Sequence, residues 1–204
     1  MHSITFAETT VTPSKIVCVG RNYVAHIQEL GNEIPGDMVV FNKPNSAISS
    51  RLRAQIDGET LHYEGEIALL ISAGEIAGVG FGLDLTRREL QSRLKAKGLP
   101  WERAKAFDGA ALFSEFVPAP ADLHTLSLRL TVNGELRQAG GVGLMIYPPA
   151  EILRELGSFT TLEDGDIVMT GTPAGVGAIR SQDRFRGALL DGDRELVSVS
   201  WQAQ

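Results

Sequence analysis

Glu64 and Glu66, which flank a single glycine, give the strongest local sign of chemistry in this sequence of 204 residues. Residues two apart in a β-strand point to the same side. The apolar run 67–71 that follows indicates that this strand enters the core. Burying two adjacent carboxylates is costly unless a cation neutralises them. The pattern therefore favours a cation site, with a solvated strand end as the alternative.

A third acid, Asp84, stands in the apolar segment 80–85, where a lone carboxylate needs a partner. If Asp84 converges with Glu64 and Glu66, the site offers three oxygen donors and no thiolate. Such a set suits Mg²⁺, with Mn²⁺ or Ca²⁺ as alternatives, and leaves coordination positions for water and substrate. A fourth ligand could come from His62, although a structural role is commoner for such a histidine.

His26 and Glu29 lie three residues apart in a predicted helix and hence on one face of it. A carboxylate that binds an imidazole fixes its orientation and raises its basicity, as deprotonation of a water molecule requires. Pairs with this spacing are also common on solvated helices. The pair by itself leaves both interpretations open.

A glycine-rich segment, 170–177, directly follows a predicted strand. It lacks the Gly-Lys-Ser/Thr ending of a phosphate-binding loop, which excludes ATP and GTP. Its backbone amides and the Thr172 hydroxyl could meet a small anion such as a carboxylate. A tight structural turn accounts for the glycines equally well.

Turn and capping residues indicate how the elements that carry these groups are bounded. Asn133-Gly134 between alternating residues predicts a β-hairpin over 128–138 with a type I′ turn. Thr86 with Glu89 three residues later predicts a capping box for a helix that ends near Lys97. Further helices are expected at 23–30 and 149–156, and strands at 15–19, 38–41, 66–71, 166–170, 196–201 and in the region ending near 84.

Strands outnumber helices, and turns join most of them. This arrangement of elements predicts a β-rich α+β fold, in which a mixed sheet rolls around a core with a few peripheral helices. It argues against a doubly wound nucleotide-binding domain. The length suits one catalytic domain over residues 1–204.

Composition and charge narrow the function. A formal net charge of −6 argues against nucleic-acid binding. No apolar run is long enough to span a membrane, and no secretory signal is recognisable at the N-terminus. The lone Cys18 fits a reducing compartment. We therefore expect a cytoplasmic protein.

Seven segments in this order resemble the fumarylacetoacetate hydrolase family, specifically its short, single-domain acylpyruvate hydrolase and oxaloacetate decarboxylase branch. The segments are 18–23 with His26 and Glu29; Phe41 with Lys43-Pro44; 62–66; 83–86 with Arg88 and Gln91; 97–101 with Ala104-Lys105; 132–138; and 163–177. The resemblance spans nearly the whole chain, and the joint pattern is far more specific than any one segment.

The resemblance implies a β-roll fold, a homodimer and a set of site residues. The family's metal carboxylates match Glu64, Glu66 and Asp84. Its water-activating pair matches His26 and Glu29, on a lid at about 26–37 that orders when ligand binds. Lys105 matches a lysine that faces the reacting oxygens, and the substrate-contacting positions match Arg21, Arg88, Gln91 and Thr172.

Two departures from the family pattern stand out. Glu89 replaces the usual aspartate, a change expected only to alter a helix start. The glycines in 140–143 replace a segment that usually carries Ser or Thr. This second departure removes hydroxyls and adds flexibility, so we expect recognition of the distal part of the substrate to differ here.

The expected reaction is the breaking of a C–C bond next to an acidic 2-oxo group. Hydrolysis of an acylpyruvate through a pyruvate enolate stabilised by Lys105 ranks first. Decarboxylation or tautomerisation of oxaloacetate ranks second, and isomerisation or decarboxylation of a longer dienedioate third. A protein that only binds a metabolite would not need His26, Glu29 and Lys105 together.

Overall fold

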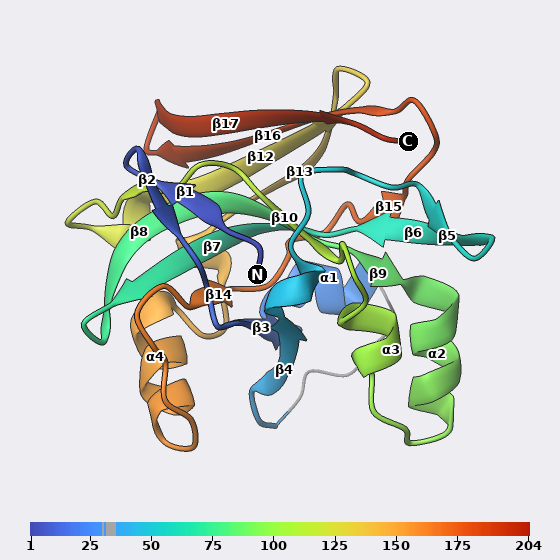
Figure 1. Ribbon diagram of the computed structural model, residues 1–204, viewed down its shortest axis with the longest axis horizontal. Coiled ribbons are helices and arrows are strands. Elements are labelled where there is room, and N and C mark those ends of the chain that lie inside the picture. The colour runs from blue at the N-terminus through green and yellow to red at the C-terminus, as the bar shows by residue number, and fades with distance from the viewer. Residues whose placement is uncertain (30, 32–35) are drawn as a thin grey trace.

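A seven-stranded mixed sheet forms the centre of the protein in the computed structural model, which describes residues 1–29, 31 and 36–204 (Figure 1). The strand order is β10-β8-β7-β14-β3-β4, with β11 also paired to β8. Among the described strands of this sheet, β14 and β3 pair in parallel and the others pair antiparallel. The strands are β3 (Lys15–Gly20), β4 (Val39–Pro44), β7 (Gly65–Ser72), β8 (Glu75–Asp84), β10 (Ala111–Phe113), β11 (Val117–Pro118) and β14 (Ile167–Met169).

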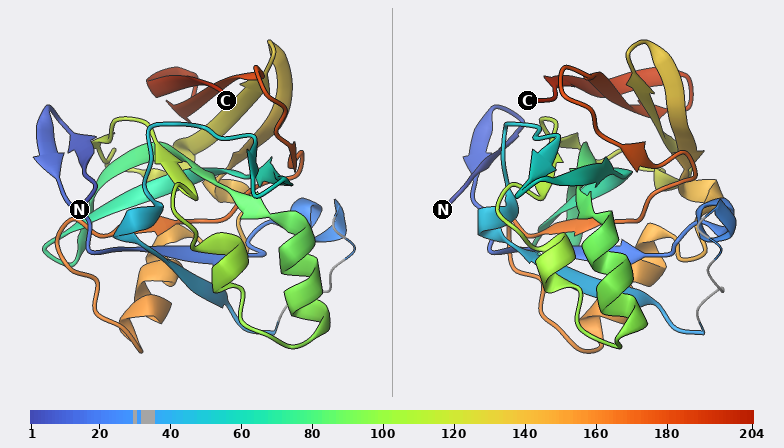
Figure 2. Two further views of the ribbon diagram at one scale, coloured as in Figure 1. Left: turned by 45° about the vertical axis from the view of Figure 1, so that its right-hand side comes forward. Right: turned by 90° about the vertical axis from the view of Figure 1, so that its right-hand side faces the viewer.

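A four-stranded antiparallel sheet, of order β13-β12-β16-β17, packs across β7 and β8 (Figures 1 and 2). Its strands are β12 (Leu126–Val132), β13 (Glu135–Gly141), β16 (Arg184–Asp191) and β17 (Arg194–Gln202). Phe81 of β8 faces Trp201 of β17 with ring centroids 6.3 Å apart. The prediction of a β-rich α+β fold with a rolled mixed sheet is confirmed.

Strand β7 is buried on both sides, which explains its apolar run 67–71. Ile67, Leu69 and Ile71 enter the larger core cluster, which also contains residues of the four-stranded sheet. Ala68 and Leu70 point to the opposite face and a smaller cluster. The carboxylates at the start of this strand therefore lie beside a core from which water is excluded.

The remaining elements are short and peripheral. Figure 2 shows α2 and α3 side by side at one end of the central sheet. The helices are α1 (Val24–Glu29), α2 (Arg88–Ala96), α3 (Glu102–Lys105) and α4 (Pro149–Gly157), and the small strands are β1 (Ile4–Phe6), β2 (Thr9–Val11), β5 (Gln55–Ile56), β6 (Glu59–Tyr63), β9 (Thr86–Arg87) and β15 (Gly177–Ala178). None of the helices in the described part of the chain is long and apolar enough to cross a bilayer.

The hairpin prediction is confirmed, but the capping-box prediction is wrong. Asn133 and Gly134 both have positive φ, 54° and 84°, as a type I′ turn requires. Helix α2 begins at Arg88, and no side chain caps it. The Thr86 hydroxyl donates instead to Glu64 Oε1 at 3.1 Å. As an N-cap the Thr86 oxygen would only accept from a backbone N–H of α2, whereas here its hydroxyl donates to a buried carboxylate in a charge-assisted hydrogen bond, so Thr86 belongs to the site.

The predicted lid over 26–37 is described only in part. Helix α1 ends at Glu29, and residues 30 and 32–35 of the lid lie outside the described residues. The ordering of this segment by ligand stays a prediction.

Candidate active site

The three acids converge at the adjoining ends of β7 and β8. Glu66 lies in β7 opposite Gly82, Asp84 ends β8, and Glu64 immediately precedes β7. The backbone N–H of Asp84 donates to the Glu64 carbonyl at 2.8 Å, and this hydrogen bond holds the end of β8 against the start of β7. All three side chains are buried, and one carboxylate oxygen from each lies within 4.8 Å of the others. The expected convergence is confirmed, whereas His62 does not join the group.

Gly65 is required for close packing behind the two glutamates. A Cβ on Gly65 would lie 3.1 Å from Gln138 Oε1 and 3.1 Å from Phe81. The same Gln138 oxygen accepts a hydrogen bond from the Gly65 N–H at 2.8 Å. The side of the chain opposite the acids is therefore filled by β13 and the core.

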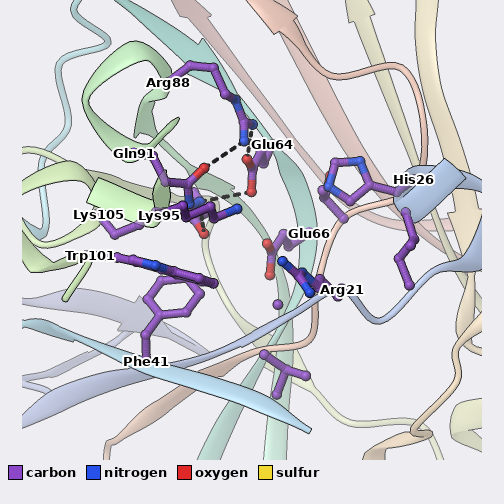
Figure 3. Close-up of a pocket in the computed structure, with 15 residues that line it drawn as sticks. Arg21, His26, Phe41, Glu64, Glu66, Arg88, Gln91, Lys95, Trp101 and Lys105 are labelled. Atoms are coloured by element: carbon purple, nitrogen blue, oxygen red, sulfur yellow. Dashed lines mark hydrogen bonds and ion pairs between the residues drawn. The ribbon is translucent and has the colours of Figure 1, made fainter. Parts of the chain in front are cut away.

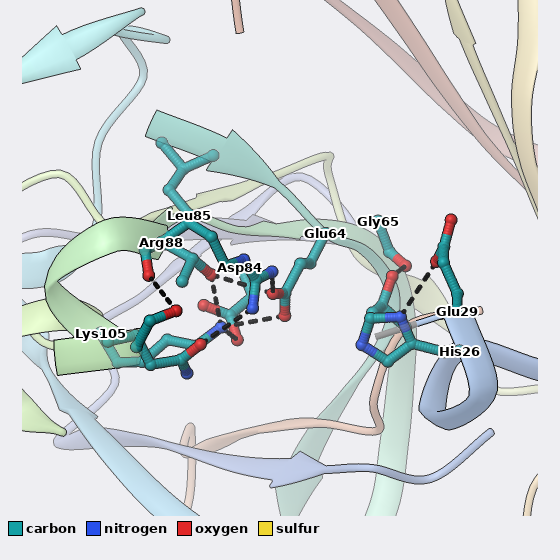
Figure 4. A network of polar contacts seen from close by, with 12 residues as sticks. His26, Glu29, Glu64, Gly65, Asp84, Leu85, Arg88 and Lys105 are labelled. Atoms are coloured by element: carbon teal, nitrogen blue, oxygen red, sulfur yellow. Dashed lines mark hydrogen bonds and ion pairs between the residues drawn. The ribbon is translucent and has the colours of Figure 1, made fainter. Parts of the chain in front are cut away.

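Three cations surround the acids. Lys105 Nζ donates to Glu64 Oε2 at 2.9 Å, to Asp84 Oδ2 at 2.8 Å and to Thr86 Oγ1 at 2.6 Å. Lys43, which is fully buried, forms an ion pair of 2.7 Å with Asp84 Oδ1. Arg88 pairs with the other oxygen of Glu64. The acids are thus partly compensated by protein charge (Figure 4).

The compensation is uneven, and the pKa values of the two glutamates move in opposite directions. Burial would raise the pKa of Glu64, but Lys105 and Arg88 outweigh it and lower that pKa. Burial raises the pKa of Glu66, and the charges of Asp84 and Glu64 raise it further. Burial would lower the pKa of Lys105, but the same two acids raise it. Glu66 is therefore the carboxylate that most needs a further positive charge.

The donor set fits a hard divalent cation. Asp84 Oδ1 is buried without a hydrogen-bond partner among the described residues, although Lys43 provides a charge nearby. Three buried carboxylates with no thiolate match the preference of Mg²⁺ and Mn²⁺ for oxygen ligands. Glu64, Glu66 and Asp84 are the residues that would hold the ion.

His26 and Glu29 come from α1 and lie on the other side of Glu64 from Lys105 (Figure 4). His26 Nδ1 lies 3.4 Å from Glu29 Oε2. Burial lowers the pKa of His26 below its usual 6.5, although Glu64 and Glu29 oppose the shift. The imidazole is therefore neutral at pH 7 and can accept a proton.

The glycine-rich loop after β14 binds protein carboxylates with its amides. The Gly171 N–H donates to Glu66 Oε2 at 2.7 Å, and the Gly175 N–H donates to Glu29 at 3.0 and 3.1 Å. Thr172 lines the pocket, but its hydroxyl donates to the Gly65 carbonyl and accepts from Gln138. Any contact of Thr172 with a substrate oxygen therefore falls to its backbone N–H.

Arg21, Arg88 and Gln91 line the same pocket, as their predicted role requires (Figure 3). Arg88 Nη1 donates to Gln91 Oε1 at 2.8 Å, so that one turn of α2 presents a linked pair. Arg21 has a positive φ of 57°, which is strained for a residue with a side chain. Its Nε is buried and unpaired among the described residues. Strain held at a pocket of this kind is typical of functional sites.

Sequence reasoning missed Lys95 and Trp101, both of which line the pocket. Arg88, Gln91 and Lys95 are spaced i, i+3 and i+7, which places all three on one face of α2. That spacing was the available signal for Lys95. Trp101 has no comparable signal, because it lies in the turn that joins α2 to α3.

Two of the glycines in 140–143 serve close packing of the backbone, and altered recognition of the distal part of the substrate stays a prediction. Gly140 and Gly141 belong to β13, and a Cβ on Gly140 would lie 2.7 Å from the Pro173 side chain. A Cβ on Gly141 would lie 2.8 Å from the Leu126 carbonyl oxygen. These glycines allow β13 to approach the loop after β14, and they are absent from the described lining of the pocket.

Comparisons with known proteins agree with the geometry. Residues 15–202 match the family model described as fumarylacetoacetate (FAA) hydrolase C-terminal. Oxaloacetate tautomerase YcgM of Escherichia coli (strain K12) is 42% identical over 189 residues, which cover 84% of this chain and 86% of the relative. The mitochondrial oxaloacetate tautomerase FMP41 of Saccharomyces cerevisiae is 34% identical over 238 residues and covers 93% and 92%.

A solved structure supports the same assignment. Fumarylpyruvate hydrolase from Pseudomonas aeruginosa, in complex with Mn²⁺ and pyruvate, superimposes with a TM-score of 0.87 at 34% identity. The superposition covers 99% of this chain and 95% of that one. The family model, the two relatives and the shared fold agree. This chain belongs to an enzyme family, the fumarylacetoacetate hydrolase family.

Proposed function

We propose that this chain catalyses keto–enol tautomerisation of oxaloacetate, with a divalent cation held by Glu64, Glu66 and Asp84. The observation that carries the proposal is the placement of a neutral base and a cation around one small pocket. His26 lies on one side of the acids and Lys105 on the other (Figure 4). Enolisation needs a group that moves a proton at carbon and a group that stabilises charge at oxygen.

Each residue has a defined part in this reaction. His26 takes a proton from C3, the C3–H electron pair forms the C2=C3 bond, and the 2-oxo oxygen keeps the carbonyl electron pair and then takes a proton from water, while the His26 imidazolium returns its proton to water. Lys105 stabilises the negative charge that develops on that oxygen. Glu29 orients the His26 imidazole. A bound divalent cation supplies polarisation of the 2-oxo and carboxylate oxygens.

The charge of the pocket supports a substrate with two carboxylates. Lys43, Lys105 and Arg88 equal the three acids in number of formal charges, while Arg21 and Lys95 have no carboxylate within 4.0 Å in the described part of the chain. A bound dication would add to this positive excess. A dianion such as oxaloacetate balances it better than a monoanion.

The activity for which the two relatives are named, oxaloacetate tautomerase, supports the four-carbon substrate over the longer dienedioates expected as third choice.

Acylpyruvate hydrolysis, ranked first from the sequence, becomes the second candidate. The His26–Glu29 pair could activate a water molecule that attacks the distal carbonyl. The neighbour that is named a fumarylpyruvate hydrolase and holds pyruvate supports this possibility. Decarboxylation of oxaloacetate would use the same enolate-stabilising groups without an attacking water.

One assay with three substrates separates these reactions. The absorbance of enol-oxaloacetate is followed during ketonisation, with and without added Mg²⁺ or Mn²⁺. Carbon dioxide release from oxaloacetate and loss of acetylpyruvate are measured in parallel. The proposal expects metal-dependent ketonisation to be fastest. Faster acetylpyruvate hydrolysis would overturn it, and binding without any turnover would identify a metabolite-binding protein.

Assembly and location belong to the same proposal. We expect a homodimer, and light scattering that gives a monomer mass at micromolar concentrations would refute it. The cytoplasm stays the expected location, and fractionation of cells that express the tagged full chain would test it.

A further inference from the structure

Lys95 lies on the face of α2 that borders the pocket, two helical turns after Arg88. At about 1.5 Å per residue, the seven-residue separation corresponds to roughly 10 Å along the helix axis. Arg88 pairs with Glu64 at the metal-binding end. The backbone of Lys95 therefore lies at the other end of a row of polar residues, with Gln91 between them, and its long side chain reaches back into the pocket.

The aromatic ring of Trp101 positions the Lys95 side chain. Lys95 Nζ lies 4.5 Å from the centroid of the Trp101 ring, within the range of a cation–π interaction. Trp101 in turn packs on Phe41 of β4, with ring centroids 6.2 Å apart. In Figure 3, Lys95 extends across the Trp101 indole toward the glutamates. The ammonium is thus held at the pocket by an aromatic support that offers no negative charge.

The Lys95 ammonium has no described carboxylate within ion-pairing distance, in contrast to Lys105 and Arg88. Burial, followed by the charges of Arg21 and Arg88, lowers the pKa of Lys95 to about 8. Arg21 approaches the pocket from the opposite side (Figure 3). Two cations that repel each other across one cavity are stabilised by an anion between them.

We infer that Lys95, supported by Trp101 and facing Arg21, binds the distal carboxylate of the substrate and selects dicarboxylates over monocarboxylates. The inference rests on the proposed function for its choice of oxaloacetate. It assigns the proximal carboxylate and 2-oxo group to the metal-binding end, beside Lys105. The distal carboxylate then lies between the Lys95 ammonium and Arg21.

A purely structural role for Lys95 makes a different prediction. Lys95 lies in the last turn of α2, where any cation interacts favourably with the helix dipole. In that case its replacement would affect the helix and all substrates alike. Lys97 is the matched control, because it is an exposed lysine at the end of the same helix and does not line the pocket.

The test compares oxaloacetate with its 4-methyl ester, which has the same carbon skeleton without the distal charge. Lys95→Met, which keeps an apolar stem on Trp101, should lower kcat/KM for oxaloacetate by about 10- to 100-fold, mainly through KM, the range for losing a hydrogen bond to a charged group. In Lys95→Met, kcat/KM for the ester should change less than about twofold. Lys95→Arg should retain most of the preference for oxaloacetate over the ester. Lys97→Met should leave kcat/KM for both substrates unchanged. Equal losses with both substrates would overturn the inference.

A binding experiment keeps the inference separate from the proposed reaction. Calorimetric titration of the Mn²⁺-loaded protein compares malate with lactate, two 2-hydroxy acids of which malate alone carries a distal carboxylate. The wild type should prefer malate, and Lys95→Met should abolish the preference while the melting temperature stays the same. An inactive wild type that shows this pattern would refute the tautomerase proposal and leave the subsite standing. An unchanged malate preference in Lys95→Met would overturn the subsite.

Discussion

The backbone N–H of Gly175 donates to both carboxylate oxygens of Glu29, at 3.0 and 3.1 Å. Glu29 in turn faces the Nδ1 atom of His26. A loop that follows β14 therefore fixes the orientation of a base carried by α1. The contact joins Gly175 and Glu29, which are 146 residues apart in the chain. The same loop holds Glu66 through Gly171. Both halves of the site are thus aligned by one glycine-rich segment.

Glu29→Gln should slow proton transfer without affecting metal binding. The amide keeps an oxygen that can accept from Gly175, but it removes the charge that raises the basicity of His26. We expect kcat for enol-oxaloacetate ketonisation to fall about 10-fold and the affinity for Mn²⁺, measured by electron paramagnetic resonance, to stay within twofold. A large loss of Mn²⁺ affinity would show that Glu29 serves the metal site instead.

Gly175→Ala should destabilise the protein and reduce activity together. Gly175 has a φ of +99°, and a Cβ there would lie 1.9 Å from the Arg137 carbonyl oxygen. Left-handed strain and the clash together should cost about 2 kcal/mol or more. Chemical unfolding measures the loss. Gly157→Ala is the control, because no atom lies within 4 Å of its added Cβ; equal stability of the two variants would contradict the structure.

Glu66→Gln should weaken metal binding and stabilise the metal-free protein. The Glu66 carboxylate is buried beside Asp84 and Glu64, and no described cation forms an ion pair with it. Removing that charge relieves repulsion, so the free energy of unfolding without metal should rise by about 1 kcal/mol, a typical trade between function and stability.

Calorimetric Mn²⁺ titration of Glu66→Gln should show a loss of affinity of at least 10-fold, the effect of losing one charged ligand. Asp193→Asn, an exposed acid in the β16–β17 turn, is the control and should bind Mn²⁺ as the wild type does. Unchanged affinity in Glu66→Gln would remove Glu66 from the metal site.

The pH dependence of activity should have limbs set by two groups of the pocket, the buried His26 and the partly buried Lys95. The pKa of His26 is lowered below 6.5, so its neutral, basic form persists as the pH falls through 6.5, and the acid limb of kcat should lie below that value. The pKa of Lys95 is about 8, so its positive charge is lost above that pH. The charged groups that influence Lys95 are Arg21, Arg88, Lys105 and Glu64.

The alkaline limb therefore concerns binding of the dicarboxylate. KM for oxaloacetate should rise above pH 8, and Lys95→Arg should move that rise to higher pH, because a guanidinium keeps its charge. Initial rates between pH 5 and 10 test both limbs. An alkaline limb that stays in place in Lys95→Arg would assign it to another group.

The acids of the site could be predicted because their local context is unusual. Glu64, Glu66 and Asp84 are charges within or beside strongly apolar strands, and burial makes such charges costly without a partner. The hairpin at Asn133-Gly134 was predictable for a similar reason, since few residues accept two successive positive φ values.

The interactions that depend on distant segments could not be predicted from local sequence. Nothing near Glu29 in the sequence indicates that its partner is Gly175. Likewise, the residues around Thr86 do not show whether its hydroxyl caps a helix or donates a hydrogen bond to Glu64. Lys95 shows the intermediate case. Its spacing from Arg88 places it on one face of α2, but only the packing of α2 beside β6 and β9 shows that this face borders the acids.

The most direct test of the proposed function is a comparison of two reactions of oxaloacetate in His26→Ala. Tautomerisation requires a base at C3, whereas decarboxylation requires only a stabilised enolate. We predict that metal-dependent ketonisation falls roughly 100-fold or more, the usual effect of losing a general base. Decarboxylation should change much less, and Lys105→Ala should impair both. If His26→Ala left ketonisation intact, or lowered the two reactions equally, the role of His26 as the proton-transferring base would be contradicted.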